Sequence, residues 1–188
     1  VTRIGDMLGG LKGGIVNLVV KYVKKMVPVY SLPEAISFKT VLSEGKGKAP
    51  IDVSLSHKDM AFLQYTGGTT GVSKGAILTH GNICGQLSQI DGWLTGLFKD
   101  GEAVVITALP LYHIFALTAN CITFFNYGAK NVLITNPRDM PAFIKDLKKN
   151  PFSLITGVNT LFNGLLNQPD FKNIDFSNLK VSLGGGMA

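Results

Sequence analysis

The chain has 188 residues, of which 46% are hydrophobic and 16% charged, and its formal net charge is +6. This composition indicates a globular protein and excludes a disordered one. No apolar run approaches the roughly 20 residues that cross a bilayer, and the first residues do not resemble a signal peptide. Cys84 and Cys121 are too few for a disulfide framework or a zinc site. We therefore expect a cytoplasmic protein.

The excess of positive charge does not indicate a nucleic-acid partner. Arg3 and Arg138 are the two arginines among 18 basic residues, and the aromatic residues do not alternate with lysines. Arginine dominates the recognition of bases and phosphates, so this pattern argues against DNA or RNA binding. Anionic lipid headgroups or phosphate-bearing substrates explain the charge equally well.

The first predicted element is a helix over residues 11–27 that ends before Pro28. It has a wide apolar face and a polar face that carries Lys21, Lys24 and Lys25. Such a helix can pack its apolar stripe on its own domain. It can also lie on an anionic membrane surface, at the inner face of the membrane for a cytoplasmic protein.

The segment 28–60 has mixed character, and residues 43–50 are polar, aperiodic and linker-like. We therefore expect an N-terminal helical and linker segment over residues 1–50. An α/β portion then follows over residues 51–188.

From residue 60 onward, short runs rich in valine and isoleucine alternate with helical stretches. The predicted strands are 62–65, 76–79, 103–107, 131–134, 153–155 and 180–183, and the predicted helices are 80–97, 114–126, 141–149 and 159–166. This alternation is typical of βαβ units. The predicted fold class is α/β, with a mostly parallel sheet that has helices on both faces.

The stretch from Tyr65 to Ala76 carries the clearest chemical signal. It holds four glycines, three threonines, one serine and Lys74 in twelve residues. Glycines let backbone N–H groups approach an anion, while hydroxyls and a lysine suit a triphosphate and its magnesium ion. Ser73 and Gly75 flank the lysine, so the spacing is not that of a Walker A loop. The loop is predicted to join two strands; a glycine-rich hairpin without a ligand is the alternative.

Residues 65–80 resemble the signature loop of the adenylate-forming enzymes, and the closest likeness is to the bacterial long-chain fatty acyl-CoA synthetases. Three further segments agree in order: Leu109–Phe115, Ile155–Phe162 and Gly184–Met187. The resemblance implies that the chain is part of the large N-terminal domain of such an enzyme. It also implies ATP-dependent ligation of a long-chain fatty acid to coenzyme A through an acyl-adenylate, with Mg²⁺ as cofactor and loose membrane association.

The resemblance also implies roles for individual residues. Lys74 would pair with the departing pyrophosphate, and the Thr66 hydroxyl would contact Mg²⁺. The residues that would bind ATP are Tyr65, Thr66, Gly67, Gly68, Thr69, Thr70, Gly71, Val72, Ser73, Lys74, Gly75, Ala76, Gly184, Gly185 and Gly186.

His113 is the second predicted catalytic residue. In the family, the matching histidine lies near the acyl carboxylate and the AMP phosphate; the alternative is a buried structural histidine. The acyl group would be bound by His113, Leu117, Gly157, Val158 and Gly185.

The sequence departs from the family pattern at its end. Gly186-Met187 stands where many members have alanine-proline, which leaves the adenine contact open. The family's Tyr-Gly-x-Thr-Glu segment and mobile C-terminal domain would lie beyond Ala188. We therefore expect little or no ligase turnover from this chain alone, and exposed apolar edges on its sheet.

Two other functional hypotheses remain. One is an adenylate-forming ligase that acts on an aromatic or amino acid. The other is a non-catalytic nucleotide-binding or membrane-binding module built on residues 11–27. The oligomeric state is not predicted.

Overall fold

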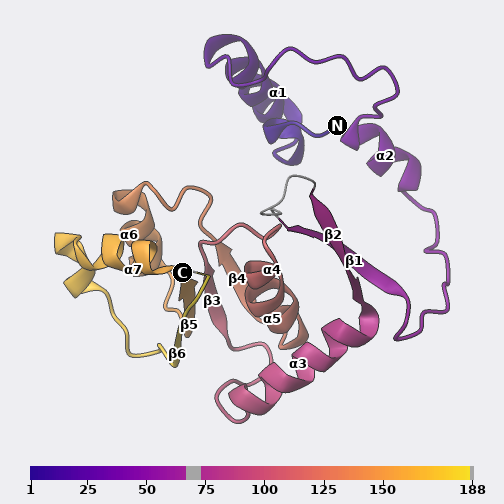
Figure 1. Cartoon of the computed structure of the whole chain (residues 1–188). Helices are drawn as coiled ribbons and strands as arrows, with labels where there is room; N and C mark the ends of the chain where they lie inside the picture. The colour runs from indigo at the N-terminus through magenta and orange to yellow at the C-terminus, as the bar shows by residue number, and fades with distance from the viewer. Residues whose placement is uncertain (67–72, 187–188) are drawn as a thin grey trace. The chain divides into compact units, whose positions relative to one another are not determined.

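The computed structural model of the chain describes residues 1–66 and 73–186. The chain divides into two compact units, residues 1–54 and residues 55–188 (Figure 1).

The first unit is helical. Its elements are a 3₁₀ turn η1 (Ile4–Met7), α1 (Gly10–Leu18), a π-helical turn η2 (Val19–Val23) that continues α1, and α2 (Phe38–Gly45). A Cβ atom added to Gly13 would lie 2.3 Å from the carbonyl oxygen of Gly5. The backbones of α1 and η1 therefore touch where neither residue has a side chain.

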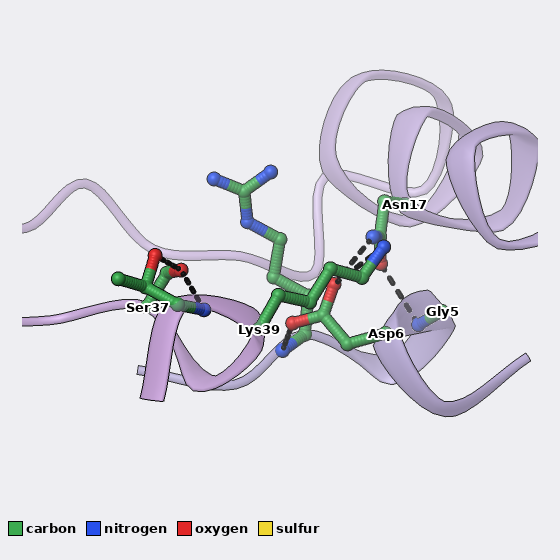
Figure 2. A network of polar contacts seen from close by, with 7 residues as sticks. Gly5, Asp6, Asn17, Ser37 and Lys39 are labelled. Atoms are coloured by element: carbon green, nitrogen blue, oxygen red, sulfur yellow. Dashed lines mark hydrogen bonds and ion pairs between the residues drawn. The ribbon is translucent and has the colours of Figure 1, made fainter. Parts of the chain in front are cut away.

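A polar network holds η1 to α1 (Figure 2). The Gly5 N–H donates to the Asn17 side-chain oxygen at 2.8 Å, and the Asn17 amide donates to Asp6 at 3.2 Å. Asp6 also accepts from the Arg3 N–H at 2.8 Å, which is the largest cause of the lowered pKa of its carboxyl. Lys39 of α2 lies 3.8 Å from the same carboxylate. Asn17 thus accepts a hydrogen bond from the Gly5 N–H at the start of η1, which has no partner within its own turn.

The predicted helix over 11–27 is too long at its C-terminal end. Helical structure stops at Val23, and Lys25 has a φ of 49°, a left-handed conformation that a helix cannot contain. Its apolar residues divide between two faces: Gly13 is buried and Val16 and Val20 are half-buried, while a second stripe is exposed. The exposed stripe consists of Leu11, Ile15, Leu18 and Tyr22.

The predicted linker over 43–50 is partly wrong, because α2 extends to Gly45. Ser37 caps this helix, with its hydroxyl accepting from the Thr40 N–H at 3.1 Å.

The second unit begins with a two-stranded antiparallel sheet. Strand β1 (Met60–Thr66) pairs with β2 (Lys74–Thr79), and Thr66 lies opposite Lys74. Helix α3 (His80–Leu94) follows at once, with Thr79 as its N-cap. The loop therefore joins two strands, as predicted, although these strands form a sheet of their own and are not part of the parallel one.

The main sheet is parallel throughout. It consists of β3 (Val104–Thr107), β4 (Lys130–Leu133), β5 (Leu154–Gly157) and β6 (Val181–Gly184), in the order β4-β3-β5-β6. All four carboxyl ends consequently lie at one edge of the sheet, where ligands bind in folds of this class.

Helices cover both faces of this sheet (Figure 1). On one face, Ile106 and Ile155 pack against α6 (Met140–Lys149) and α7 (Asn159–Leu166). On the other face, Val105 and Leu154 pack with Phe124 of α5 (Thr123–Asn126), which continues α4 (Ile114–Ala116) and the π-helical turn η3 (Leu117–Ile122). A 3₁₀ turn, η4 (Pro169–Asn173), follows α7.

The predicted α/β class is confirmed, and each predicted strand and helix of this unit is found within a few residues of its predicted bounds. The edge strands expose apolar side chains, as expected: Leu133 of β4 is 54% exposed and Leu183 of β6 is 41% exposed. Within the described ranges, no helix is both long and apolar enough to span a bilayer.

Candidate active site

The two arms of the predicted phosphate loop lie in the antiparallel hairpin. Tyr65 and Thr66 end β1, and Lys74, Gly75 and Ala76 begin β2. The side chain of Lys74 is exposed, as are those of Thr66 and Ser73. The predicted residues Gly67, Gly68, Thr69, Thr70, Gly71 and Val72 lie outside the described residues.

Gly75 has a packing reason to be glycine. A Cβ atom added there would lie 3.3 Å from the Tyr65 ring, which rests over the bare backbone of β2. The Thr66 hydroxyl is 3.5 Å from the Lys74 carbonyl oxygen, which makes a weak hydrogen bond at most. Among the residues that the structure describes, that hydroxyl has no stronger partner, so it keeps its capacity to bind another group.

His113 lies at the start of α4, six residues after the last residue of β3. It is the N-cap residue of this helix, and its Nδ1 accepts a hydrogen bond from the Phe115 N–H at 3.2 Å. The side chain is exposed, so the alternative of a buried structural histidine is wrong. Because Nδ1 is the acceptor of this hydrogen bond, the neutral tautomer that fits it carries its proton on Nε2, as a donor for a ligand.

The carboxyl ends of β5 and β6 meet at a pair of glycines. Gly157 lies opposite Gly184 in the register, and the Gly185 N–H donates to the Gly157 carbonyl oxygen at 3.2 Å. A Cβ atom added to Gly157 would come within 3.0 Å of the Phe162 ring. The glycine therefore lets α7 approach the strand end closely.

The next two glycines, Gly185 and Gly186, lie close to Phe115 of α4 and to Val158, respectively. A Cβ atom on Gly185 would lie 3.5 Å from the Phe115 ring, two residues after His113, and one on Gly186 would lie 3.8 Å from Val158. Gly186 has a φ of 75°, a left-handed conformation that favours glycine. The structure thus brings together Gly157, Val158, Gly184, Gly185 and Gly186 with the start of α4.

Leu117 lies one helical turn after His113, and its N–H donates to the His113 carbonyl oxygen at 2.9 Å. Its side chain is half-buried. No hydrogen bond or ion pair between described residues joins Lys74 to this sheet edge, so the predicted site residues fall into two groups.

A groove of about 340 Å³ lies at the carboxyl ends of β3 and β4, between Thr107–Leu111 and Leu133–Pro137. It is bordered by the segment that leads to His113. A second cavity, of about 210 Å³, lies at the opposite edge of the sheet, between Phe98, Val104 and Lys180, away from the predicted site residues.

A buried polar network beneath this edge was not predicted. Asn120 and Thr156 are fully buried and Thr107 is almost so, and hydrogen bonds join the three side chains. An asparagine within the apolar run of the predicted helix 114–126 is a signal that could have found it.

Residues 16–188 match the family described as AMP-binding enzyme. The chain belongs to this family. The match covers both groups of predicted site residues in this AMP-binding enzyme.

The chain is 55% identical over 187 residues to a long-chain-fatty-acid–CoA ligase of Yersinia pestis, covering 100% of this chain and 33% of the ligase. The AMP-binding chain therefore spans about a third of the length of the curated relatives it matches.

Among solved structures, the N-terminal domain of FACL13 from Mycobacterium tuberculosis matches with a TM-score of 0.66 and 21% identity over 81% of this chain and 37% of that one. This likeness supports the same fold. O-succinylbenzoate coenzyme A synthetase (MenE) from Bacillus subtilis, in complex with AMP, matches with a TM-score of 0.63 and 26% identity over 81% of this chain and 30% of that one.

Proposed function

We propose that the full-length protein joins a long-chain fatty acid to coenzyme A at the expense of ATP, through an acyl-adenylate. The observation that carries this proposal is the 55% identity over the whole chain to a ligase of that name. The exposed histidine and the glycine strand ends at one sheet edge provide a site where a carboxylate and a nucleotide can meet.

In the first step, a fatty-acid carboxylate oxygen attacks the α-phosphorus of ATP. A bond forms between that oxygen and phosphorus, and the bond to the bridging oxygen breaks, so that pyrophosphate leaves. Negative charge accumulates on the departing group, and a lysine ammonium neutralises it. Lys74, exposed at the start of β2, supplies this charge.

His113 orients the carboxylate and the α-phosphate in this proposal. Its Nδ1 is engaged by the Phe115 N–H, so Nε2–H is the donor left for an oxygen of the substrate. Gly184, Gly185 and Gly186 offer bare backbone to the flat adenine ring, and Leu117 and Val158 border the acyl group.

Coenzyme A acts in the second step. Its thiolate attacks the acyl carbonyl carbon, the thioester C–S bond forms, and the bond between that carbon and the phosphate oxygen breaks, so that AMP leaves with the electron pair.

Mg²⁺ fits this site as a companion of the nucleotide. The described part of the chain holds no cluster of three or more His, Cys, Asp or Glu side chains placed to bind a metal ion. Magnesium in nucleotide sites takes one or two protein ligands, with phosphates and waters completing its shell. The Thr66 hydroxyl would be such a ligand, and the bound ion would neutralise phosphate charge.

Calorimetric titration with ATP and Mg²⁺ tests the role of Lys74. We expect Lys74→Ala to weaken binding by about 10- to 100-fold, since a charge-assisted contact contributes roughly 1.5–3 kcal/mol. Lys58→Ala, an exposed lysine before β1, is the matched control and should bind as wild type does. Equal, measurable affinities for wild type and Lys74→Ala would contradict the proposed contact.

Acyl-CoA formation by the full-length protein tests the substrate class. We expect palmitate to give a higher kcat/KM than a short carboxylic acid. A preference for the short acid, or for an aromatic or amino acid, would support the alternative ligase.

A second proposal concerns location: the protein is cytoplasmic and touches an anionic membrane surface through α1–η2. The exposed stripe of Leu11, Ile15, Leu18 and Tyr22 supports this proposal, because it shares one short helix with Lys21, and Lys24 follows directly after the helix.

Co-sedimentation with vesicles that contain phosphatidylserine tests it. We expect binding to exceed that to neutral vesicles, and changing Lys21, Lys24 and Lys25 to glutamate should remove the excess. Persistent binding by the glutamate variant would rule out an electrostatic contact.

A further inference from the structure

Asn120 is a fully buried polar residue within the helix that begins at His113. It lies in the π-helical turn η3, and its exposed fraction is 0%. Burial of an amide is unfavourable unless its donors and acceptor are paired. The partners of Asn120 therefore indicate what the residue is placed to hold.

These partners come from three strands of the parallel sheet. The Asn120 amide donates to the Thr107 hydroxyl of β3 at 3.0 Å, and its side-chain oxygen accepts from the Thr156 hydroxyl of β5 at 2.9 Å. The Asn120 backbone carbonyl accepts from the Asn131 amide of β4 at 3.2 Å. Thr107 closes the network by donating to Asn131 at 2.7 Å.

The network lies directly beneath the candidate active site. Thr107 is the last residue of β3, and Thr156 precedes Gly157, whose carbonyl oxygen binds the Gly185 N–H. A single helix residue is thus bonded to both strand ends that flank the site. Because its side-chain bonds go to two strands at once, it limits both sliding and rotation of the helix.

The π-helical turn adds a second constraint. The Thr123 N–H donates to the Thr118 carbonyl oxygen, and the Thr123 hydroxyl donates to the same oxygen at 2.7 Å. A π turn widens the helix, changes the direction of the side chains that follow it, and occurs frequently at functional sites. Here it separates the site end of the helix, with His113 and Phe115, from the end that packs in the core.

We propose that Asn120 is a positioning residue, which fixes the height and rotation of the α4–η3 helix so that His113 meets the substrate. This inference rests on the proposed adenylation reaction. It assigns Asn120 no contact with substrate: the residue acts through the helix.

The variant Asn120→Leu in the full-length protein tests the proposal. We expect kcat for acyl-adenylate formation to fall about 10- to 100-fold, because small displacements of a positioning group have effects of that size. The affinity for ATP should fall less than kcat does, since Lys74 and Thr66 lie on the separate hairpin. Asn126→Leu, at an exposed asparagine that ends the same helix, is the matched control and should leave kcat unchanged.

Combination with His113→Ala separates positioning from a general structural role. If Asn120 acts through His113, Asn120→Leu should cause little further loss in the His113→Ala background. An undiminished, multiplicative loss in that background would overturn the proposal. A fall in kcat for Asn126→Leu equal to that for Asn120→Leu would overturn it as well.

A second variant covers the case in which Asn120→Leu does not fold. Asn120→Leu with Thr107→Val and Thr156→Val replaces the three buried polar side chains by apolar ones of similar shape, which leaves no unpaired hydroxyl; the half-buried Asn131 loses its Thr107 donor. We expect stability to recover while the defect in kcat remains. Recovery of kcat together with stability would reduce Asn120 to a packing residue.

Amide hydrogen exchange distinguishes a failure of this inference from a failure of the proposed function. Absence of acyl-adenylate formation in the wild-type protein would refute the function itself. Independently of activity, the Phe115 and Leu117 amides should exchange faster in Asn120→Leu than in Asn126→Leu. Equal exchange in the two variants would refute the positioning role.

Discussion

At the scale of single residues, Tyr127 joins two helical segments that are distant in the sequence. Its hydroxyl donates to the Asp91 carboxylate of α3, and its ring packs edge-on against Phe98 in the core beside the sheet. Hydrogen bonds to charged groups contribute about 1.5–3 kcal/mol. We expect Tyr127→Phe to lower the free energy of unfolding by about that amount in urea titrations at pH 8. Tyr112→Phe, at an exposed tyrosine, should have no measurable effect.

The same bond makes stability depend on alkaline pH. The hydrogen bond to Asp91, burial and nearby negative charge raise the pKa of Tyr127 from 10.0 to about 12. Between pH 10 and 12 the unfolded tyrosine loses its proton while the folded one keeps it, so the contribution of Tyr127 is complete below pH 10 and is lost as the pH rises to 12. The stability difference between wild type and Tyr127→Phe should therefore shrink over that range. A difference that grows with pH would contradict this assignment.

Two glycines of the candidate site should respond differently to alanine. At Gly157 the new methyl group would lie 3.0 Å from Phe162, whereas at Gly185 it would lie 3.5 Å from Phe115, which is ordinary contact. We expect Gly157→Ala to cost about 1–3 kcal/mol of stability, as overpacking does. Gly185→Ala should keep its stability and lose ATP affinity, because the methyl group occupies the proposed adenine surface.

Thermal unfolding and ATP titration of both variants check this contrast. Unchanged ATP affinity in Gly185→Ala would remove Gly185 from the nucleotide site.

At the scale of elements, the contact of α1 with η1 depends on Gly13. Its Cβ would lie 2.3 Å from the Gly5 carbonyl oxygen, whereas a Cβ on the neighbouring Gly14 meets nothing within 4 Å. We expect Gly13→Ala to separate η1 from α1 and to speed amide exchange at Gly5. Gly14→Ala should stabilise the helix by about 1 kcal/mol, the difference in helix propensity. Equal exchange rates in the two variants would show that the contact is dispensable.

The elements of the parallel sheet could be predicted because their signal is local. Runs such as Val104–Thr107 and Leu154–Gly157 are short, apolar and separated by helical stretches, which is the pattern of strands buried on both faces. The position of His113 before a helix followed from its place in the motif. The location of the glycines at strand ends followed in the same way.

Features that depend on pairing between distant residues could not be predicted. Asn120 bonds to Thr156, which is 36 residues away, and neither segment alone predicts this contact. The π-helical turn that begins at Leu117 is stabilised by hydrogen bonds that the hydrophobic periodicity of the sequence does not reveal. Helix α2 was not predicted although Ser37 is a good N-cap, because the helix is short and runs directly into the glycine- and lysine-rich residues 45–48, which are typical of a linker.

At the scale of the whole molecule, the fold separates two tasks. The antiparallel hairpin carries Lys74 and Thr66, and the carboxyl edge of the parallel sheet carries His113 and Gly185. Sequence order alone predicted both groups but not that they belong to different sheets. A ligand that needs both groups must therefore bridge them.

The strand order β4-β3-β5-β6 governs how this protein can fold while it is being synthesised. Val104 can pair with Lys130 early, but Val105 meets Leu154 only after a further helix has left the ribosome. Until then one edge of β3 has no strand to pair with in the nascent chain. We expect β3 to be sensitive to protease in ribosome-bound chains that are stalled after β4 has emerged but before β5 has. It should be protected in chains stalled after β5 has emerged. Protection of β3 before β5 emerges would show that β3 folds stably without β5.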